Sequence, residues 1–463
     1  MKYFTTYLLV LASLWFTPGA NATFCWDFLN FLNKDCSSVL AEWVCENVRP
    51  YCFECCQATI VSFGDSLTDS GEYSSPNSFE ELLENAWGVD EVDWEDEYDN
   101  GYYKGSATNE PGTWSAQVGI YGHAKELNYA YVAAEVRQDS EILSIQDPAG
   151  FCVGSNQCIP TKGIPLDEDN CLDIAKGNCQ VRYTDPEEVI AEPQQLIPGA
   201  IRQVQNFLND YENDEVSIRN PGRAAIVIHS FGGNDPSVWL RRVSEGLETT
   251  TQEEFGQQVV GTIIQAVLLV KQNPKTQDFP VFVTGLLPLQ YTPASLINAG
   301  FNQTNEDFIA AQLYVQGVNF GLQQAAQNGV PGLGLPPGLF NYIDTYTVFI
   351  DEVLGSPQFL YKGDNPFQPL SCVTGICHFY ASPLDAAFKT FPFVTPECAP
   401  SPETCQIVDI SCTPCDNPDD FVWFDAAHPS GAAHGIISNF IKAEINAQLG
   451  HTFIHEPSPA RLR

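Results

Sequence analysis

The sequence is poor in positive charge. Its 463 residues include 21 Lys and Arg against 58 Asp and Glu, which gives a formal net charge of −37 at pH 7. Such a chain repels nucleic acids and anionic membrane surfaces, so neither is an expected partner. The acidity instead favours solubility, or tolerance of an acidic medium in which many carboxylates are neutral.

Long hydrophobic runs are missing after the N-terminus. The nearest candidate, 259–270, is interrupted by Thr262 and Gln265, so we predict a buried helix there rather than a membrane span. Residues 1–22 combine a basic start, a short apolar stretch and the small-x-small site Ala20-Asn21-Ala22, a pattern typical of a signal peptide. An N-terminal anchor helix is the alternative. We expect a secreted, extracellular protein without stable membrane insertion.

Two common hydrolase signatures are also absent. Gly-x-Ser-x-Gly, the nucleophile elbow of α/β-hydrolases, does not occur, since Thr68 stands where the second glycine would be. The zinc-protease motif His-Glu-x-x-His is missing as well, and the chain has no internal repeat of fixed period. These absences argue against an α/β-hydrolase elbow and against a zincin protease.

Cysteines, in contrast, are abundant and fall into three groups of even size. Disulfides within each group are the simplest prediction for an exported chain, although the sequence does not fix their connectivity. Cys52/Cys55 and Cys412/Cys415 have the spacing of zinc or redox pairs, which is the alternative. Asn302-Gln303-Thr304 is an acceptor for N-glycosylation in a eukaryotic host, which would make the protein a glycoprotein. The groups are Cys25, Cys36, Cys45, Cys52, Cys55, Cys56; Cys152, Cys158, Cys171, Cys179; and Cys372, Cys377, Cys398, Cys405, Cys412, Cys415.

The cysteine groups suggest how the chain is divided. Residues 23–57 read as a cysteine-rich N-terminal extension. We expect the main domain at 58–449, with disulfide-rich insertions at about 145–195 and 356–415, followed by a tail at 450–463.

Apolar strands alternate with amphipathic helices along the main domain. This pattern predicts an α/β fold with a mostly parallel sheet covered on both faces, and sites in such sheets form at the carboxyl ends of strands. The expected strands are 58–63, 224–229, 281–284 and 342–344, and the expected helices lie around 201–211, 259–268, 306–327 and 431–449.

Ser66 and His428 supply the parts of a hydrolytic site. Ser66 follows an apparent strand end, where Gly64 permits a sharp turn and Asp65 can hydrogen-bond the local backbone. A serine hydroxyl needs a base and the base needs an orienting partner, and Asp425 lies three residues before His428. The sequence therefore predicts a Ser-His-Asp site.

Two further segments offer donors for a tetrahedral oxyanion. Gly232-Gly233-Asn234-Asp235 follows a buried strand and can place the Asn234 amide at the sheet edge, although an ordinary Gly-Asn turn is the alternative. The segment 128–134 is rich in small residues and could offer backbone N–H groups.

Taken in order, these segments resemble the SGNH, or GDSL-type, serine esterase/lipase family. Gly64-Asp65-Ser66-Leu67 is similar to its nucleophile block, Gly232-Gly233-Asn234-Asp235 to its asparagine block, and Asp425-Ala426-Ala427-His428-Pro429 to its final block. Weaker support comes from 108–114, which resembles a Thr-Asn-Gly-x-x-Trp stretch, and from 342–346, which resembles a late strand leading into a helix.

The resemblance covers roughly 58–449. It implies a three-layer α/β/α sandwich and ester hydrolysis without a metal or other cofactor. It assigns Ser66 as the nucleophile, His428 as the base and then the acid, and Asp425 as its orienting partner.

For the oxyanion hole, the resemblance implies the Ser66 backbone N–H, the Asn234 side chain and the Ala133 backbone N–H. The sequence departs from the family here, because Val132-Ala133 stands where the family has a glycine pair. The added Cβ could narrow the pocket or demand another backbone angle.

The leading interpretation is a secreted serine esterase acting on carboxylic esters, either lipid acyl esters or acetyl esters of polysaccharide. An acyltransferase on the same site and a non-catalytic binding protein that keeps the fold are the alternatives. The other histidines lack a comparable carboxylate context, and structural or surface roles are expected for His123, His229, His378, His434, His451 and His455.

Overall fold

The structure is a computed structural model. It describes residues 58–70, 108–122, 124–131, 134–137, 198–218, 220–244, 248–362, 369–372, 415–425, 427–449 and 454, with the backbone alone of 151–153, 157–159, 393–394 and 407–408. The expected signal peptide and N-terminal extension lie outside the described residues. So do most of both expected insertions and, apart from Ile454, the expected C-terminal tail.

A five-stranded sheet in the order β2-β1-β5-β6-β7 forms the centre of the described chain, and each of its pairings is parallel. The four predicted strands are confirmed, with β1 shifted one residue toward the C-terminus and β7 one residue toward the N-terminus, and β2 is an additional strand. Their bounds are β1 (Thr59–Gly64), β2 (Lys125–Asn128), β5 (Ala224–His229), β6 (Val281–Thr284) and β7 (Asn341–Ile343).

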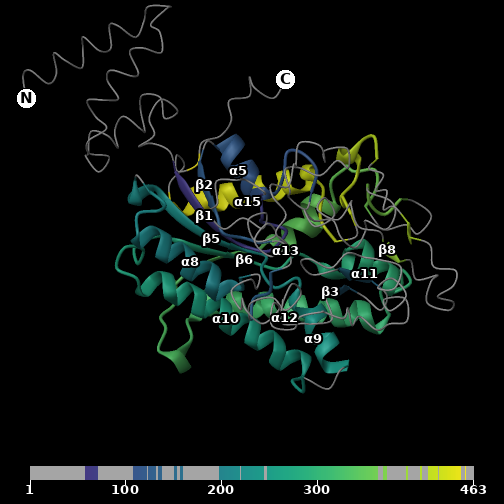
Figure 1. Cartoon of the computed structure of the whole chain (residues 1–463), viewed down its shortest axis with the longest axis horizontal. Coiled ribbons are helices and arrows are strands. Elements are labelled where there is room, and N and C mark those ends of the chain that lie inside the picture. The colour runs from purple at the N-terminus through teal and green to yellow at the C-terminus, as the bar shows by residue number, and fades with distance from the viewer. Residues whose placement is uncertain are drawn as a thin grey trace, which may run out of the picture.

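Helices pack against the sheet in two groups, visible below and above it in Figure 1. One group is α8 (Ala200–Glu212), α10 (Gln252–Gln272) and α12 (Glu306–Asn328), and the other is α5 (Trp114–Gly122) and α15 (Gly431–Leu449). The helices expected around 201–211, 259–268, 306–327 and 431–449 are thereby confirmed. α10 begins at a capping box in which Thr251 and Glu254 bond each other's backbone N–H groups.

Alternate residues of the central strands enter different hydrophobic clusters. Val61 and Phe63 of β1 pack with α8 and α10, whereas Ile60 packs in the cluster that contains α5 and α15. Since both faces of the strand are covered, each of its six residues is buried. This explains why the strands read as unbroken apolar runs and confirms the α/β class.

Shorter elements complete the described part of the chain. They include α9 (Asp235–Ser244), α11 (Pro293–Asn298), α13 (Thr345–Val348) and the π-helix η9 (Phe349–Leu354), with 3-10 turns η6 (Pro221–Arg223), η7 (Leu289–Tyr291), η8 (Pro331–Leu333) and η13 (Pro418–Asp420). Two small antiparallel ladders lie within the expected insertions, β3 (Phe151–Val153) with β4 (Gln157–Ile159) and β8 (Phe393–Val394) with β9 (Ile407–Val408). Among the described helices, none combines the length and apolar character that a membrane crossing requires.

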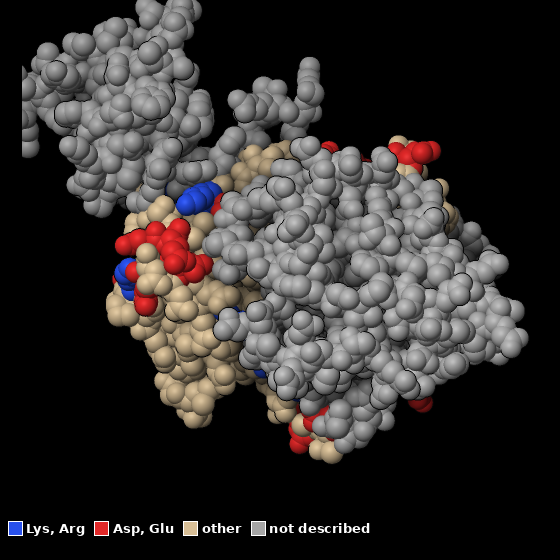
Figure 2. Space-filling view, in the orientation of Figure 1, with Lys and Arg blue, Asp and Glu red and all other residues tan. Residues whose placement is uncertain are grey.

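One face of the described residues shows the acidic excess of the sequence. On the face in Figure 2, the red areas of Asp and Glu are more extensive than the blue areas of Lys and Arg. The visible charge therefore agrees in sign with the net charge of −37 for the whole chain.

Candidate active site

The site lies at the carboxyl ends of β1 and β5. These strands pair in parallel, and the register places Gly64, the last residue of β1, opposite His229, the last residue of β5. A Cβ on Gly64 would stand 2.6 Å from Thr68 Oγ1 and 3.0 Å from the His229 carbonyl oxygen. Only glycine therefore lets the chain turn this closely after the strand.

Ser66 stands on a tight corner immediately after β1. The Asp65 carbonyl oxygen accepts hydrogen bonds from the N–H groups of Thr68, at 2.9 Å, and Asp69, at 3.0 Å. The Asp65 carboxylate accepts a third bond, 3.0 Å long, from the Leu67 N–H. As the sequence predicted, Asp65 bonds the local backbone, and Ser66 is left 5% exposed.

Asp425 and His428 lie on a turn just before α15. The turn is closed by a bridge between Trp423 and Pro429 and by a 2.8 Å hydrogen bond from the Phe424 N–H to the His428 carbonyl oxygen. Asp425 is fully buried, and its Oδ1 accepts 2.8 Å bonds from the N–H groups of Ala427 and His428. The carboxylate is thus fixed by the backbone of the segment that carries the histidine.

The imidazole of His428 connects this turn to Ser66. Its Nδ1 lies 2.8 Å from Asp425 Oδ2, and its Nε2 lies 2.7 Å from Ser66 Oγ, across 362 residues of sequence. Burial lowers the pKa of His428, but the charge and hydrogen bond of Asp425 and the charge of Asp65 outweigh it and raise the pKa above its usual value. The structure therefore brings together the three residues that the sequence singled out.

Asn234 lies on the loop between β5 and α9, next to Gly233, where a Cβ would stand 3.5 Å from Asp65 Oδ2. Gly232 has φ +122°, a backbone conformation that side chains disfavour, and it allows the loop to turn away from the strand. The Asn234 side-chain NH2 donates a 3.0 Å hydrogen bond to the Ala134 carbonyl oxygen. This bond uses one of the two hydrogens of the NH2 group. The prediction for Ala133 falls outside the described residues, as does its neighbour Val132.

Asp235 anchors the same loop from its other side. Its buried carboxylate accepts bonds from the N–H groups of Val136, at 2.9 Å, and Arg137, at 3.3 Å. Burial raises the pKa of Asp235 to about 6, although these N–H groups and the Arg137 guanidinium oppose the rise. This role could not be predicted, because nothing in the sequence reveals that 134–137 lies against the start of α9.

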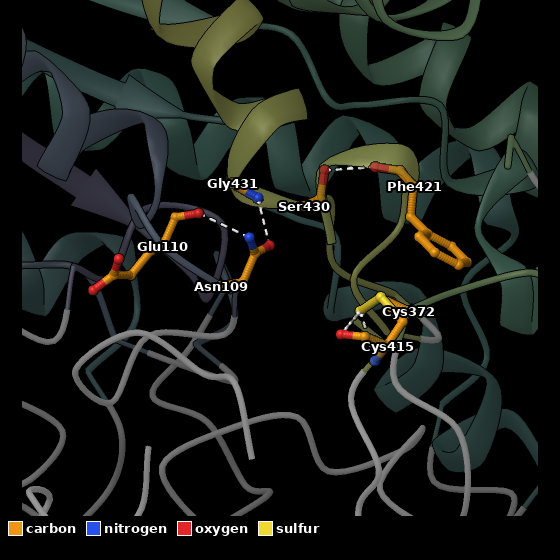
Figure 3. The surroundings of a disulfide bond; sticks show 7 residues. All are labelled: Asn109, Glu110, Cys372, Cys415, Phe421, Ser430 and Gly431. Atoms are coloured by element: carbon orange, nitrogen blue, oxygen red, sulfur yellow. Dashed lines mark hydrogen bonds between the residues drawn. A yellow bond between two sulfur atoms is a disulfide. The ribbon is translucent and has the colours of Figure 1, made fainter. Parts of the chain in front are cut away.

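The segment 108–114 holds in place the turn 423–429 that carries His428, called the histidine turn below. Thr108 Oγ1 donates a 2.8 Å bond to the Pro429 carbonyl oxygen. Asn109 accepts a 2.8 Å bond from the Gly431 N–H through Oδ1 and donates one of 2.8 Å to the Glu110 carbonyl oxygen (Figure 3). The sequence marked this segment only as weak support for a family resemblance, and its contacts with the final block are new.

The histidine turn is tied to the chain on a second side. Ser430 Oγ donates a 2.7 Å bond to the Phe421 carbonyl oxygen, and the Cys372 N–H donates one of 3.1 Å to the Trp423 carbonyl oxygen. Cys372 and Cys415 form a disulfide with a Cα–Cα distance of 4.9 Å (Figure 3). Both belong to the third cysteine group, so pairing within groups is confirmed for this pair.

Two other histidines lie in the described chain, and both are buried. His229 Nδ1 is 3.0 Å from Thr284 Oγ1, and its ring is 4.8 Å from that of Trp114. Burial lowers the pKa of His229 well below its usual value and lowers that of His434 to about 3. Their neutral, buried state agrees with the structural roles expected, whereas His123, His378, His451 and His455 lie outside the described residues.

The described residues contain no group of three or more His, Cys, Asp or Glu side chains arranged to hold a metal ion.

Comparison with known proteins adds little about the site. No family model matches the chain, and no curated protein is similar to it. Among solved structures, one aligns with 85% of this chain and 99% of its own, at 10% identity and a TM-score of 0.33. A likeness at this level supports no statement about activity.

Proposed function

We propose that the protein is a secreted serine hydrolase of the SGNH type that cleaves carboxylic esters on a three-layer α/β/α scaffold. The observation that carries the proposal is the hydrogen-bonded series Ser66–His428–Asp425, with distances of 2.7 and 2.8 Å. The Asn234 amide on the neighbouring loop supports it. The substrate class is lipid acyl esters or acetyl esters of polysaccharide.

In the first half of the reaction, Ser66 Oγ attacks the carbonyl carbon of the ester while its proton passes to His428 Nε2. Asp425 stabilises the imidazolium that forms and keeps Nδ1 protonated. The carbonyl oxygen becomes an oxyanion. It accepts hydrogen bonds from the remaining Asn234 N–H, the Ser66 backbone N–H and a backbone N–H at Ala133. The tetrahedral intermediate then collapses, and His428 returns the proton to the departing alcohol.

The second half repeats these steps with water. His428 takes a proton from water as the hydroxyl attacks the acyl-Ser66 carbonyl. The second intermediate then collapses, His428 returns the proton to Ser66 Oγ, and the acid is released. The net reaction converts one ester and one water into one acid and one alcohol. It requires no cofactor.

Replacement of the nucleophile tests the proposal directly. We expect Ser66→Ala to abolish hydrolysis of short-chain p-nitrophenyl esters and labelling by a fluorophosphonate probe. Loss of His428 should lower kcat by roughly 10³-fold or more, as for triad members generally. Ser217→Ala, which alters an exposed serine away from the site, is the matched control and should leave both readouts unchanged.

Equal turnover by the wild-type protein and Ser66→Ala would refute the assignment. Absence of probe labelling in the wild-type protein would instead favour a non-catalytic binding protein. Product analysis with an added sterol or sugar acceptor distinguishes the hydrolase, which yields free acid, from an acyltransferase. A panel of acetyl-xylan and short- and long-chain glycerides then identifies the substrate class.

A further inference from the structure

Asp65, the residue before the proposed nucleophile, is a buried carboxylate outside the Ser66–His428–Asp425 series. It is 2% exposed, and its side chain accepts the 3.0 Å bond from the Leu67 N–H. The backbone of Gly233, in the loop that carries Asn234, also favours the ionised form of this carboxylate. A Cβ placed on Gly233 would stand 3.5 Å from Asp65 Oδ2, so the two segments are in contact.

The carboxylate therefore connects two parts of the site. On one side it fixes the corner from which Ser66 projects, and on the other it meets the backbone next to Asn234. Asp235 binds the far side of the same loop to Val136 and Arg137. An error of about 1 Å in the position of a reacting group can cost as much as 100-fold in rate, so such a connection matters for turnover.

Asp65 also lies close to the base, because it directly precedes Ser66, whose Oγ is 2.7 Å from His428 Nε2. Its charge is one of the influences that raise the pKa of His428, after those of Asp425. The interaction is mutual, because the charge of His428 in turn favours ionised Asp65. The other ionisable groups facing Asp65 are Asp235, whose charge opposes its ionisation, and Tyr314.

We propose that Asp65 is a positioning residue that holds the corner carrying Ser66 against the loop carrying Asn234. Its carboxylate also places a second negative charge near the His428 imidazolium. This inference rests on the proposed function. The charge is costly to keep, since burial raises the pKa of Asp65 to about 7. Asp65 and His428 each favour the charged form of the other, so their protonation is linked.

Asp65→Asn separates charge from size. The variant keeps an acceptor for the Leu67 N–H, loses the negative charge, and turns an NH2 group toward its surroundings. We expect kcat at the pH plateau to fall by roughly 10- to 100-fold with a smaller change in KM. We also expect the acidic limb of kcat/KM to move to lower pH, because an imidazolium with one fewer neighbouring negative charge loses its proton more readily.

Asp210→Asn is the matched control. Asp210 is another buried carboxylate, bonded at 2.7 Å to the Tyr129 hydroxyl, and it is not among the groups that shift His428. We expect this variant to keep the wild-type kcat and acidic limb. Thermal unfolding of both variants shows that each is folded before kinetics are compared.

An NMR titration of the His428 ring, assigned with His428→Gln, gives a readout that does not depend on turnover. A lower pKa of His428 in Asp65→Asn supports the proposal even if the natural substrate is not an ester. An unchanged His428 pKa, an unchanged acidic limb or a wild-type kcat in Asp65→Asn would each overturn it. Failure of the proposed function is seen separately, as a wild-type protein that neither hydrolyses esters nor reacts with the fluorophosphonate.

Discussion

Under the proposed mechanism, the Asn234 side chain has two uses. One hydrogen of its amide bonds the Ala134 carbonyl oxygen at 3.0 Å, which fixes the orientation of the whole group. The other hydrogen is then held in a defined direction before any substrate arrives. Such preorganised donors stabilise developing charge more effectively than donors that must first reorient.

We therefore expect Asn234→Ala to lower kcat by roughly 10²-fold, equivalent to about 3 kcal/mol of transition-state stabilisation, with little change in KM. Steady-state kinetics on a p-nitrophenyl ester measure the effect. The fluorophosphonate should still label Ser66, but more slowly, because its phosphoryl oxygen uses the same donors. A kcat within twofold of the wild-type value would remove Asn234 from the proposed oxyanion hole.

At the scale of secondary-structure elements, the start of α15 carries the histidine turn. Gly431, its first residue, lies against the backbone of Asn109 and Glu110, and a Cβ there would overlap the Glu110 carbonyl oxygen. Asn109 accepts a hydrogen bond from the Gly431 N–H, and Thr108 donates one to the Pro429 carbonyl oxygen. The position of His428 thus depends on a segment more than 300 residues earlier, the separation of Asn109 and Gly431 being 322.

Removing this connection should weaken the site without touching the reacting groups. We expect Asn109→Ala to destabilise the protein by about 1–3 kcal/mol, since it leaves the buried Gly431 N–H without its acceptor. It should also lower kcat by roughly tenfold through displacement of His428. The matched control is Asn305→Ala, which removes the N-cap of α12 and should cost about 1 kcal/mol with no change in kcat. Equal kcat values for the two variants would contradict this role of Asn109.

The elements that the sequence predicted are those whose burial leaves a simple pattern. β1, β5 and β6 are mainly apolar because helices cover both faces, and α10 and α12 each follow an N-cap residue, Thr251 and Asn305. α5 was not predicted, because Ser115 and Gln117 are buried in it with its apolar residues, so no polar face marks it as a helix.

The same contrast holds for the site. Ser66, Asp425 and His428 could be found because each stands in a short local pattern whose chemistry needs those residue types. The second roles of Asp65, Asn109 and Asp235 could not, because they arise from contacts between segments distant in sequence. Nothing along a single chain fixes which backbone N–H will meet a given carboxylate.

At the scale of the whole molecule, buried histidines connect stability to pH. His434 is 1% exposed, and burial lowers its pKa in the folded protein from 6.5 to about 3. Below pH 6.5 the unfolded chain therefore binds a proton that the folded chain does not, so stability falls as the pH falls. Relief of repulsion among the carboxylates acts in the opposite direction.

Glutamine cannot take up a proton, so we expect His434→Gln to lose less unfolding free energy than the wild-type protein when the pH falls from 6.5 to 5. The difference should be about 2 kcal/mol, since each pH unit is worth about 1.36 kcal/mol per proton. Denaturant unfolding at several pH values measures this slope, and a constant loss at all pH values from imperfect packing does not alter it. Identical slopes in the two proteins would show that His434 is protonated in the folded state.

The order of the chemical groups along the chain has a consequence for biosynthesis. The hydroxyl of Ser66 leaves the ribosome just after β1, and the other four strands of the central sheet follow before the segment 423–431 is made. Domains generally fold as units, so the site is not assembled until this last segment has been made. A nascent chain of the proposed esterase therefore holds a nucleophile without its base, and the producing cell is spared hydrolysis of its own esters until synthesis is nearly finished.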